Sequence, residues 1–295
     1  MTRRIDAYSL RLFVATATEG SIARAAAKEH IAASALSRRI SDLEHALGVA
    51  LFVRSPRGIE LTNAGQVVFD RGLKIDQDIQ LLKRDVQASD GVVNGTVRLS
   101  ANMSSIIGYL PERLKSYTAT FPQVTLALSE EDTEVVLRAC LDDEADVGVG
   151  VKVDVPAGIE SWFFASDPLL VVMPVGHALA GERSIRFAQA LQHPLIGVHP
   201  GGSLDTLLQE QAKAMGGVAS FAVQVNSFDA ACRMVEAGLG ITLIPRSAAS
   251  AYAGTRKFIR RPLGETWAAR ELWIYSLRKS PRLRSVQALI DALQD

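Results

Sequence analysis

Residues 34–40 of the chain read Ser-Ala-Leu-Ser-Arg-Arg-Ile, and the pattern that starts there decides the fold of the N-terminal region. Leu36, Ile40, Leu43 and Leu47 recur at intervals of four and three, which predicts an α-helix with one buried apolar stripe. The opposite face carries short polar and basic side chains, and such a face fits the major groove of DNA. We therefore expect a DNA-recognition helix. Its predicted contact residues are Ala33, Ser34, Ser37 and Arg38.

Capping residues predict two further helices before this one. Asp6 can accept hydrogen bonds from the first turn of a helix, and Gly20 is suited to end that helix in the left-handed conformation. Ser21 can cap a short second helix that is rich in alanine. Small side chains on this second helix allow its neighbours to pack closely against it.

A short hairpin is predicted after the recognition helix. Residues 50–54 and 58–61 read as two strands around the turn Ser55-Pro56-Arg57-Gly58. Arg54 and Arg57 place two guanidinium groups on this wing, where they can contact phosphates or the minor groove. Three helices followed by a basic wing favour a DNA-binding domain over a small helical domain with solvated serines and arginines.

Charge is distributed unevenly, although the formal net charge of the 295 residues is zero. Residues 1–65 hold nine Lys and Arg against six acids, whereas residues 91–295 hold 19 against 21. A basic N-terminal region attached to a weakly acidic remainder fits a phosphate-binding module joined to a part that does not bind DNA.

A longer set of ordered motifs runs through the N-terminal region. It consists of Leu10, Phe13, Ser21, Ala25-Ala26, Ser34-Ala35-Leu36-Ser37, Ile40, Leu43-Glu44, Leu47-Gly48, Leu51-Phe52, Arg54 and Leu61-Thr62-x-Ala64-Gly65. This set resembles the LysR-type transcriptional regulators. Many of those proteins have Ser-Gln where this chain has Ala32-Ala33, which favours apolar contact with a thymine methyl group at that position.

The resemblance implies a multidomain α+β fold. We expect an N-terminal winged helix-turn-helix, a long linker helix, and a C-terminal effector domain of two α/β lobes like those of periplasmic binding proteins. The expected domains are residues 1–62, 63–90 and 91–295, with lobe one at 91–165 and 264–295 and lobe two at 166–263.

Thr62 can cap the linker helix, which is predicted over residues 63–88. Its apolar stripe, interrupted at Gly72, consists of Val68, Ile75, Ile79, Leu82 and Val86. An apolar seam with polar flanks is typical of a coiled coil, although it also suits a helix packed on its own domain. The family resemblance favours self-association through this helix, as a homodimer and then as a dimer of dimers, a homotetramer.

From Thr96 onward, strands and helices alternate, which predicts α/β lobes with mostly parallel sheets. Residues 109–121 are expected to complete a helix that Ser104 or Ser105 can cap. Helices that begin at the ends of such strands point free N–H groups into the cleft between the lobes, and these favour an anion. We expect a small anionic effector there, most simply a carboxylate, although each hydroxyl is also an ordinary helix cap. The residues expected to bind it are Ser104, Ser105, Thr133, Ser203 and Ser227.

Motifs for catalysis or cofactor binding are absent from the sequence. It contains no P-loop, no HExxH metal motif and no nucleophile elbow. The five histidines show no metal-ligand spacing, so we expect no enzyme, no metal and no cofactor. His199 follows a predicted strand and is expected either to line the cleft or to have a structural or solvent-facing role.

The N-terminus and the cysteines suggest a cytoplasmic protein. No apolar segment follows Arg3 and Arg4, so we expect no signal peptide, and no run is long enough for a membrane span. Cys140 and Cys232 are far apart in the sequence and are expected to be buried thiols in a reducing compartment.

Together these features favour a sequence-specific transcriptional regulator that binds double-stranded promoter DNA and is modulated by a small effector. The alternative is a solute-binding protein or an enzyme of the same two-lobed fold that carries an unrelated helical head. Salt-dependent binding to the DNA upstream of its own gene would distinguish the two.

Overall fold

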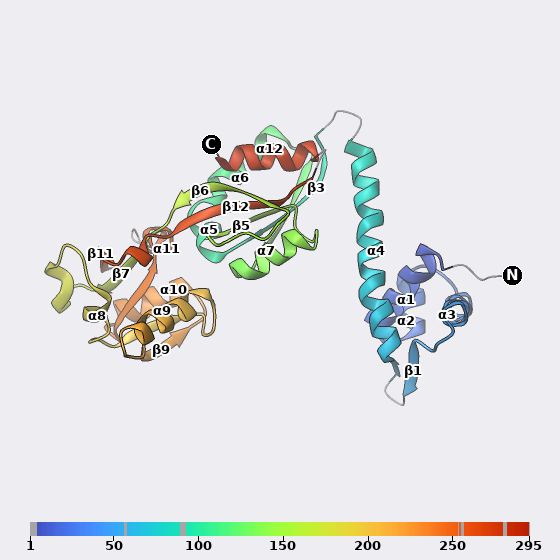
Figure 1. The fold of residues 1–295 in the computed structure, drawn as a ribbon, viewed down its shortest axis with the longest axis horizontal. Helices are drawn as coiled ribbons and strands as arrows, with labels where there is room; N and C mark the ends of the chain where they lie inside the picture. Colours follow the sequence, from blue (N-terminus) through green and yellow to red (C-terminus); the bar gives the residue numbers. More distant parts are fainter. Residues whose placement is uncertain are drawn as a thin grey trace. The chain divides into compact units, whose positions relative to one another are not determined.

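A computed structural model describes residues 5–55, 58–88, 93–252, 254, 257–279 and 282–294. The chain divides into two compact units, Met1–Asp90 and Gly91–Asp295, whose secondary structure is drawn in Figure 1. None of the described helices has both the length and the apolar character that crossing a membrane requires.

The first unit, called the head here, packs three helices with a hairpin and one long helix. Asp6 caps the first helix, since the Ser9 N–H donates to its carboxylate at 2.9 Å, and Gly20 ends that helix with φ 61°. Leu12 and Leu36 are fully buried in the bundle. The elements are α1 (Ala7–Glu19), α2 (Ile22–Lys28), α3 (Ala33–Leu47), β1 (Phe52–Ser55), β2 (Gly58–Leu61) and α4 (Asn63–Ala88).

Helix α4 uses its apolar stripe in two ways. Thr62 caps the helix, because the Gly65 N–H donates to the Thr62 hydroxyl at 2.9 Å. Val68 packs into the core of the head, and a Cβ on Gly72 would lie 2.8 Å from the Val14 side chain on α1. Ile75 and Leu82, further along, are 38% and 63% exposed. Val68 therefore belongs to the core of the head and not to a free apolar stripe. At this end of α4 the structure agrees with the second interpretation, a helix packed on its own domain.

The second unit begins with lobe one, whose five-stranded sheet has the order β4-β3-β5-β12-β6. Strand β3 is parallel to β4 and β5, whereas β12 is antiparallel to β5 and β6. Helices α7 and α12 cover opposite faces of this sheet (Figure 1). The elements are β3 (Gly95–Ala101), α5 (Met103–Gly108), α6 (Leu110–Thr120), β4 (Val124–Glu130), α7 (Thr133–Leu141), β5 (Val147–Val151), β6 (Ile159–Ser166), β12 (Glu271–Leu277) and α12 (Arg284–Gln294).

Lobe two has a second five-stranded sheet, in the order β11-β7-β10-β8-β9. Strand β8 is parallel to β9 and β10, and β7 is antiparallel to β10 and β11. The elements are β7 (Leu169–Pro174), η1 (Ala178–Gly181), α8 (Phe187–Ala190), β8 (Leu195–Val198), α9 (Ser203–Ala214), β9 (Phe221–Val225), α10 (Phe228–Glu236), β10 (Ile241–Pro245), α11 (Arg246–Ala251), β11 (Phe258–Pro262) and η2 (Thr266–Ala268).

Both sheets are mixed, so the expectation of mostly parallel sheets was wrong. The reason is that the chain passes from lobe one to lobe two after β6 and returns before β12, and strands next to these crossings run against their neighbours. The two crossings touch, because the Asp167 N–H donates to the Arg270 carbonyl at 2.9 Å. Trp267 and Ala268 still pack in the core of lobe two, which puts the return crossing a few residues after 264.

The segment after β3 also differs from the expectation. Two helices, α5 and α6, replace the single helix over 109–121, and neither Ser104 nor Ser105 is a cap. Asn102 caps α5 by accepting the Ser105 N–H at 3.1 Å. Pro111 lies in the first turn of α6, where a proline is tolerated and where it separates the two helices.

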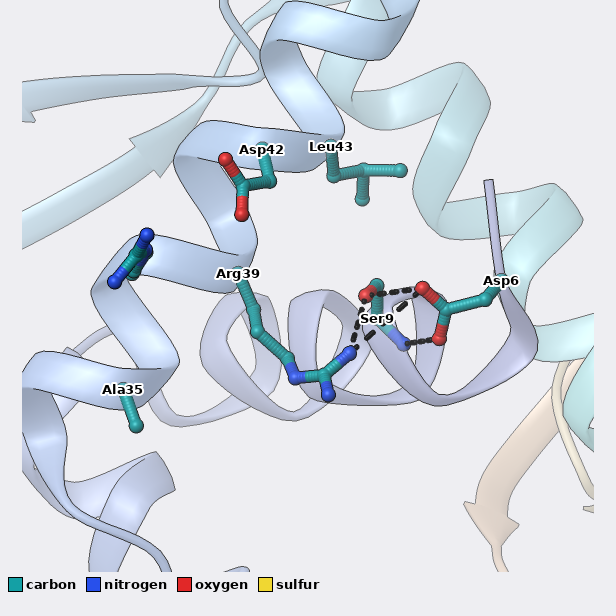
Figure 2. A pocket seen from close by; sticks show the side chains of 7 residues that line it. Asp6, Ser9, Ala35, Arg39, Asp42 and Leu43 are labelled. Atoms are coloured by element: carbon teal, nitrogen blue, oxygen red, sulfur yellow. Dashed lines mark hydrogen bonds and ion pairs between the residues drawn. The ribbon is translucent and has the colours of Figure 1, made fainter. Parts of the chain in front are cut away.

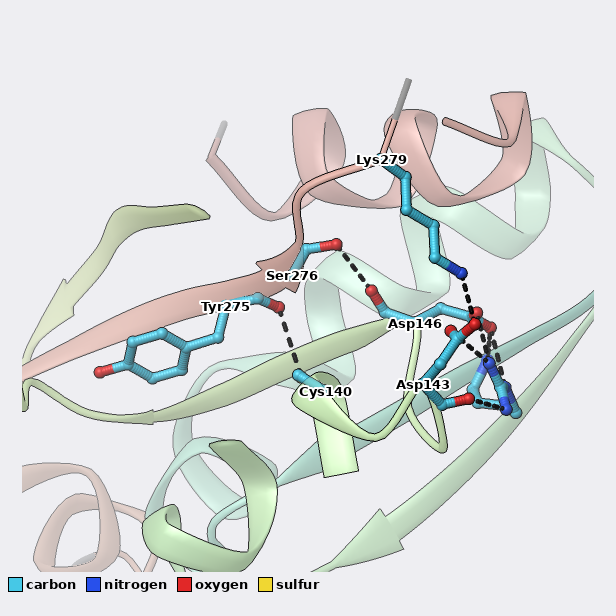
Figure 3. A network of polar contacts seen from close by, with 7 residues as sticks. Cys140, Asp143, Asp146, Tyr275, Ser276 and Lys279 are labelled. Carbon is cyan, nitrogen blue, oxygen red and sulfur yellow. Dashed lines mark hydrogen bonds and ion pairs between the residues drawn. The ribbon is translucent and has the colours of Figure 1, made fainter. Parts of the chain in front are cut away.

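A polar network ties three parts of lobe one together (Figure 3). The Arg98 guanidinium on β3 lies 2.9 Å from the Asp146 carboxylate and 3.3 Å from that of Asp143, which also receives Lys279 at 2.6 Å. Cys140 lies beside this network with its Sγ 3.8 Å from the Tyr275 carbonyl, and burial raises the pKa of its thiol to about 12. A thiol so hard to ionise is suited to packing rather than to chemistry.

Candidate functional site

Helix α3 presents the predicted contact residues on one face. Ala33, Ser34 and Arg38 are exposed and Ser37 is half-buried, whereas Leu36 on the other side is fully buried. The N-cap residue of α3 is Ala32, which has no side chain able to accept the first N–H groups of the helix. Backbone donors at such a helix start are suited to bind a phosphate.

Two adjacent arginines on α3 have different environments, and Figure 2 shows that of Arg39. The Arg39 guanidinium donates to the Ser9 hydroxyl at 3.3 Å, lies 3.8 Å from the Asp6 carboxylate, and sits 4.9 Å from the centre of the Tyr8 ring. Arg38 is exposed and makes no hydrogen bond or ion pair within the described part of the chain. Arg39 is thus used to hold α3 against α1, and Arg38 is the arginine available to a ligand.

The wing is present as an antiparallel pair of strands. Phe52 pairs with Leu61 and Arg54 with Ile59 in the register of β1 and β2. Arg57, the other predicted contact on the wing, lies outside the described residues.

A second candidate site is a small cavity between the two lobes, with a volume of about 60 Å³. This is room for a few water-sized groups. Its polar lining consists of Asn102, Ser104 and Asp132 from lobe one, His199 and Ser203 from lobe two, and Arg270 from the return crossing. Its apolar lining consists of Met103, Val198, Leu204, Phe228 and Pro245.

Arg270 is the most unusual residue of this cavity. Its Nη1 atom is shielded from solvent and has no hydrogen-bond partner within the described ranges. Burial lowers the pKa of its guanidinium, which the nearby Asp167 carboxylate opposes. The guanidinium still stays protonated, because arginine is not deprotonated in proteins. The cavity therefore contains a positive charge with unused donor capacity.

Asp167 interacts electrostatically with Arg270, but the hydrogen bonds that its carboxylate accepts come from elsewhere. It is fully buried and accepts the Ser247 N–H at 2.8 Å and the Ser247 hydroxyl at 2.9 Å. Burial raises the pKa of Asp167, and the hydrogen bonds from Ser247 oppose that rise. These bonds fix the first crossing against the start of α11.

His199 is a second polar residue of the cavity with an unsatisfied atom. Its Nε2 is shielded and has no partner within the described ranges, and its backbone has the left-handed φ of 51°. The backbone is held there by two bonds: its N–H donates to Val225 at 2.8 Å, and its carbonyl accepts the Gly202 N–H at 2.9 Å. Strained backbone of this kind persists where the surroundings fix it, often at a functional site.

Asp132 and Ser203 connect the two lobes across the mouth of the cavity. Asp132 is the N-cap residue of α7, yet its carboxylate caps nothing on its own helix. It accepts instead a hydrogen bond from the Ser203 hydroxyl at 2.9 Å. The Asp132 Oδ1 atom of lobe one therefore forms a hydrogen bond with lobe two.

Comparison with known proteins places both units in one family. Residues 8–66 match the model described as the bacterial regulatory helix-turn-helix protein, lysR family, and residues 90–295 match the LysR substrate binding domain. The chain belongs to the LysR family of transcriptional regulators.

Individual relatives agree with this assignment. A RuBisCO operon transcriptional regulator from Allochromatium vinosum is 26% identical over 278 residues, which are 93% of this chain and 90% of that protein. The regulator TfdT from Cupriavidus pinatubonensis is 31% identical over 193 residues, 65% of this chain and 84% of that one. The solved structure of full-length CbnR with its target DNA has a TM-score of 0.73 at 21% identity and covers 98% of this chain and 99% of that one.

This LysR-type regulator brings only two of the five predicted hydroxyls to the cavity, Ser104 and Ser203. The other three serve their own lobes. The Ser105 hydroxyl donates to Asn102, the Thr133 hydroxyl accepts the Val151 N–H at 3.1 Å, and the Ser227 hydroxyl caps α10 through the Ala230 N–H at 3.1 Å. These three are structural caps and braces in the regulator.

Sequence reasoning also missed Asn102, Asp132 and Arg270 in the regulator's cavity. Arg270 belongs to no motif, and its signal is positional: it lies directly before β12, at the return crossing. In a chain that crosses twice between lobes, the residues at the crossings necessarily border the cleft. Asp132 had a weaker signal, as the residue before a predicted helix.

Proposed function

We propose that this LysR-type regulator controls transcription in response to a small effector that carries a carboxylate or similar anionic group and binds between the two lobes. The observation that supports it is that Arg270 lines the cavity and that its shielded Nη1 has no hydrogen-bond partner within the described residues. A buried charged donor left unpaired is costly, and an anionic ligand would remove that cost. Ser104 and Ser203 add hydroxyls that orient the ligand from either lobe.

On the DNA side, the proposal assigns contact to Ala33, Ser34, Ser37 and Arg38 on α3 and to Arg54 and Arg57 on the wing. Two heads are needed to read two half-sites about one helical turn apart, which requires a dimer. The exposed Ile75 and Leu82 of α4 support self-association through this helix, as a dimer and further as a dimer of dimers. Because bacterial promoter DNA is in the cytoplasm, we propose that the protein acts there.

Effector and DNA are coupled if the effector prefers one arrangement of the lobes over another. An anion held by Arg270 at the crossing, and by one residue from each lobe, has such a preference. We propose that binding draws the lobes together and changes how the paired heads contact the promoter.

The test is calorimetry of a panel of small carboxylates against the parent protein and the Arg270→Met variant. We expect Arg270→Met to weaken the binding of any carboxylate ligand by at least about 2 kcal/mol, because a shielded charged partner is lost. Arg138→Met removes an exposed arginine from α7, away from the cavity, and should leave binding unchanged.

Gel shifts on DNA from upstream of the gene, with and without the ligand, then link the cavity to the promoter. Unchanged carboxylate affinity in Arg270→Met would contradict the proposed site. A ligand that binds without changing any contact with promoter DNA would contradict the proposed coupling.

A further inference from the structure

The cavity between the lobes contains a negative charge as well as a positive one. Asp132 lines it from the start of α7, whereas Arg270 lines it from the return crossing. A ligand with only an anionic group would satisfy Arg270 but would lie in the same small space as the Asp132 carboxylate, which repels it. The lining is therefore complementary to a ligand that carries both charges.

Asp132 has unused acceptor capacity. Its Oδ1 accepts the Ser203 hydroxyl at 2.9 Å, and a carboxylate has about four acceptor positions. Its Oδ2 lies beside Gly202, 3.5 Å from where a Cβ on that glycine would stand. The absence of a side chain at Gly202 leaves this oxygen accessible from the cavity side.

His199 lies on the same side of the cavity as Asp132. The His199 Cβ lies 3.2 Å from the position that a Cβ on Gly202 would occupy. The side chains of His199 and Asp132 therefore both border this glycine. The unpartnered His199 Nε2 acts as an acceptor in the tautomer that carries its proton on Nδ1. Two acceptors, one of them charged, thus lie together, and an ammonium group with three donors matches them.

Arg270 and Ser104 form the other pole. Both lie near the buried Asp167: the Arg270 charge and a hydrogen bond from Ser104 each lower the pKa of that carboxyl group. The guanidinium donors match a carboxylate, and the Ser104 hydroxyl, which donates to Asn102 at 3.4 Å, turns from that bond to reach it. The whole cavity, about 60 Å³, suits a compact head group, and Leu204 and Phe228 are part of its apolar lining.

We propose that the effector is a small amino acid, with its carboxylate on Arg270 and Ser104, its ammonium on Asp132 and His199, and an apolar or small side chain. This rests on the proposed function and narrows it from a carboxylate to a carboxylate that bears an amino group. Asp132 is then the residue that distinguishes an amino acid from the corresponding plain acid.

The experiment uses matched ligands that differ only in one charge. Calorimetry compares L-alanine with propanoate, L-valine with 3-methylbutanoate, L-leucine with 4-methylpentanoate and L-phenylalanine with 3-phenylpropanoate. Valinamide, leucinamide and phenylalaninamide keep the ammonium and lose the carboxylate. At least one amino acid should bind the full-length parent protein about five- to tenfold more tightly than its plain acid, and more tightly than its amide.

The Asp132→Asn variant isolates the negative pole. Asparagine keeps an acceptor for the Ser203 hydroxyl, so the contact between the lobes can persist while the charge is lost. We expect the preference for the amino acid over the plain acid to fall to about one, with affinity for the plain acid unchanged or raised. Glu131→Gln, a neighbouring exposed carboxylate that does not line the cavity, is the matched control and should keep the full preference.

Different results separate the two proposals. Plain acids that bind the parent as tightly as the amino acids, with Asp132→Asn improving both, would overturn the amino-acid assignment and leave the carboxylate effector standing. Binding of amino acids that Arg270→Met does not weaken, or no binding of any member of the four pairs, would overturn both.

Discussion

Arg38 on α3 and the Nη1 atom of Arg270 in the cleft both lack a hydrogen-bond partner within the described residues, but they differ in their exposure to water. Arg38 is exposed on the surface of α3, whereas the Arg270 Nη1 is shielded from solvent. A charge in water is screened by salt and acts on any phosphate nearby, while a shielded charge is screened little and requires a ligand of matching shape. Burial therefore decides how strongly salt weakens the interaction that each arginine makes with its ligand.

The cavity and the DNA-binding face of the head also differ in how many chains each needs to bind its ligand. Residues from both lobes and from the crossing complete the cavity within a single chain. The head offers one recognition helix, and a two-fold DNA site needs two. Disrupting self-association should therefore affect the head and leave the cavity working.

The largest effect is expected from the Ile75→Glu, Ile79→Glu double variant. Glutamates in an apolar seam would carry unpaired charge into the interface, so the dimer should dissociate and specific DNA binding should be lost. Light scattering measures the mass, and calorimetry with the effector should give the parent affinity. Gln66→Glu, on the opposite side of α4, is the control. An unchanged mass in the double variant would rule out association through this stripe.

A smaller effect is expected from Arg38→Ala. Loss of the available guanidinium should weaken specific DNA binding by about 1–3 kcal/mol and relax base preference. Gel-shift titrations on specific and random DNA measure both. Arg57→Ala should instead weaken binding to all sequences alike, since wing arginines contact the backbone.

Arg39→Ala is the matched control for Arg38, because Arg39 holds Ser9 and Asp6 on α1. It should lower the melting temperature of the protein more than Arg38→Ala and relax base preference less. The reverse pattern would mean that Arg39 rather than Arg38 reaches the DNA.

The smallest effect is expected when salt is raised during effector binding. Between about 50 and 200 mM salt, DNA affinity should fall by orders of magnitude if several phosphates are neutralised. Effector affinity should fall much less than DNA affinity, because one small ligand replaces few ions and the Arg270 Nη1 is shielded from solvent, although Asp132 is exposed. Calorimetry and gel shifts at matched salt concentrations provide the measurement. A steep salt dependence of effector binding would place the bound anion at the surface.

Local sequence signals were sufficient where a structure depends on near neighbours. Asp6, Ser21 and Thr62 each cap the helix that follows them, as predicted. The stripe of α3 likewise follows from its own spacing, since each buried residue is set by helix geometry. The head was therefore readable almost to its element boundaries.

The lobes were less readable because their elements depend on distant partners. Strand β6 was not predicted: a bulge opposite Leu272 and Trp273 breaks its alternation of buried and exposed residues. Strand β11 was missed because it pairs on one side only, with β7, and carries Arg260 and Arg261. The cavity was harder still, since Arg270 meets Ser104 and Asp132 only after the chain has crossed twice between lobes.

The bond between the Asp167 N–H and the Arg270 carbonyl joins the two segments by which the chain passes between the lobes. Arg270 therefore lies at the junction of the two lobes, where it also lines the cavity. In the proposed mechanism, a shift of a fraction of an ångström at this junction would move the far end of each lobe much further. The distance of each lobe's far end from this junction, rather than the number of ligand contacts, would then set how far the lobe moves.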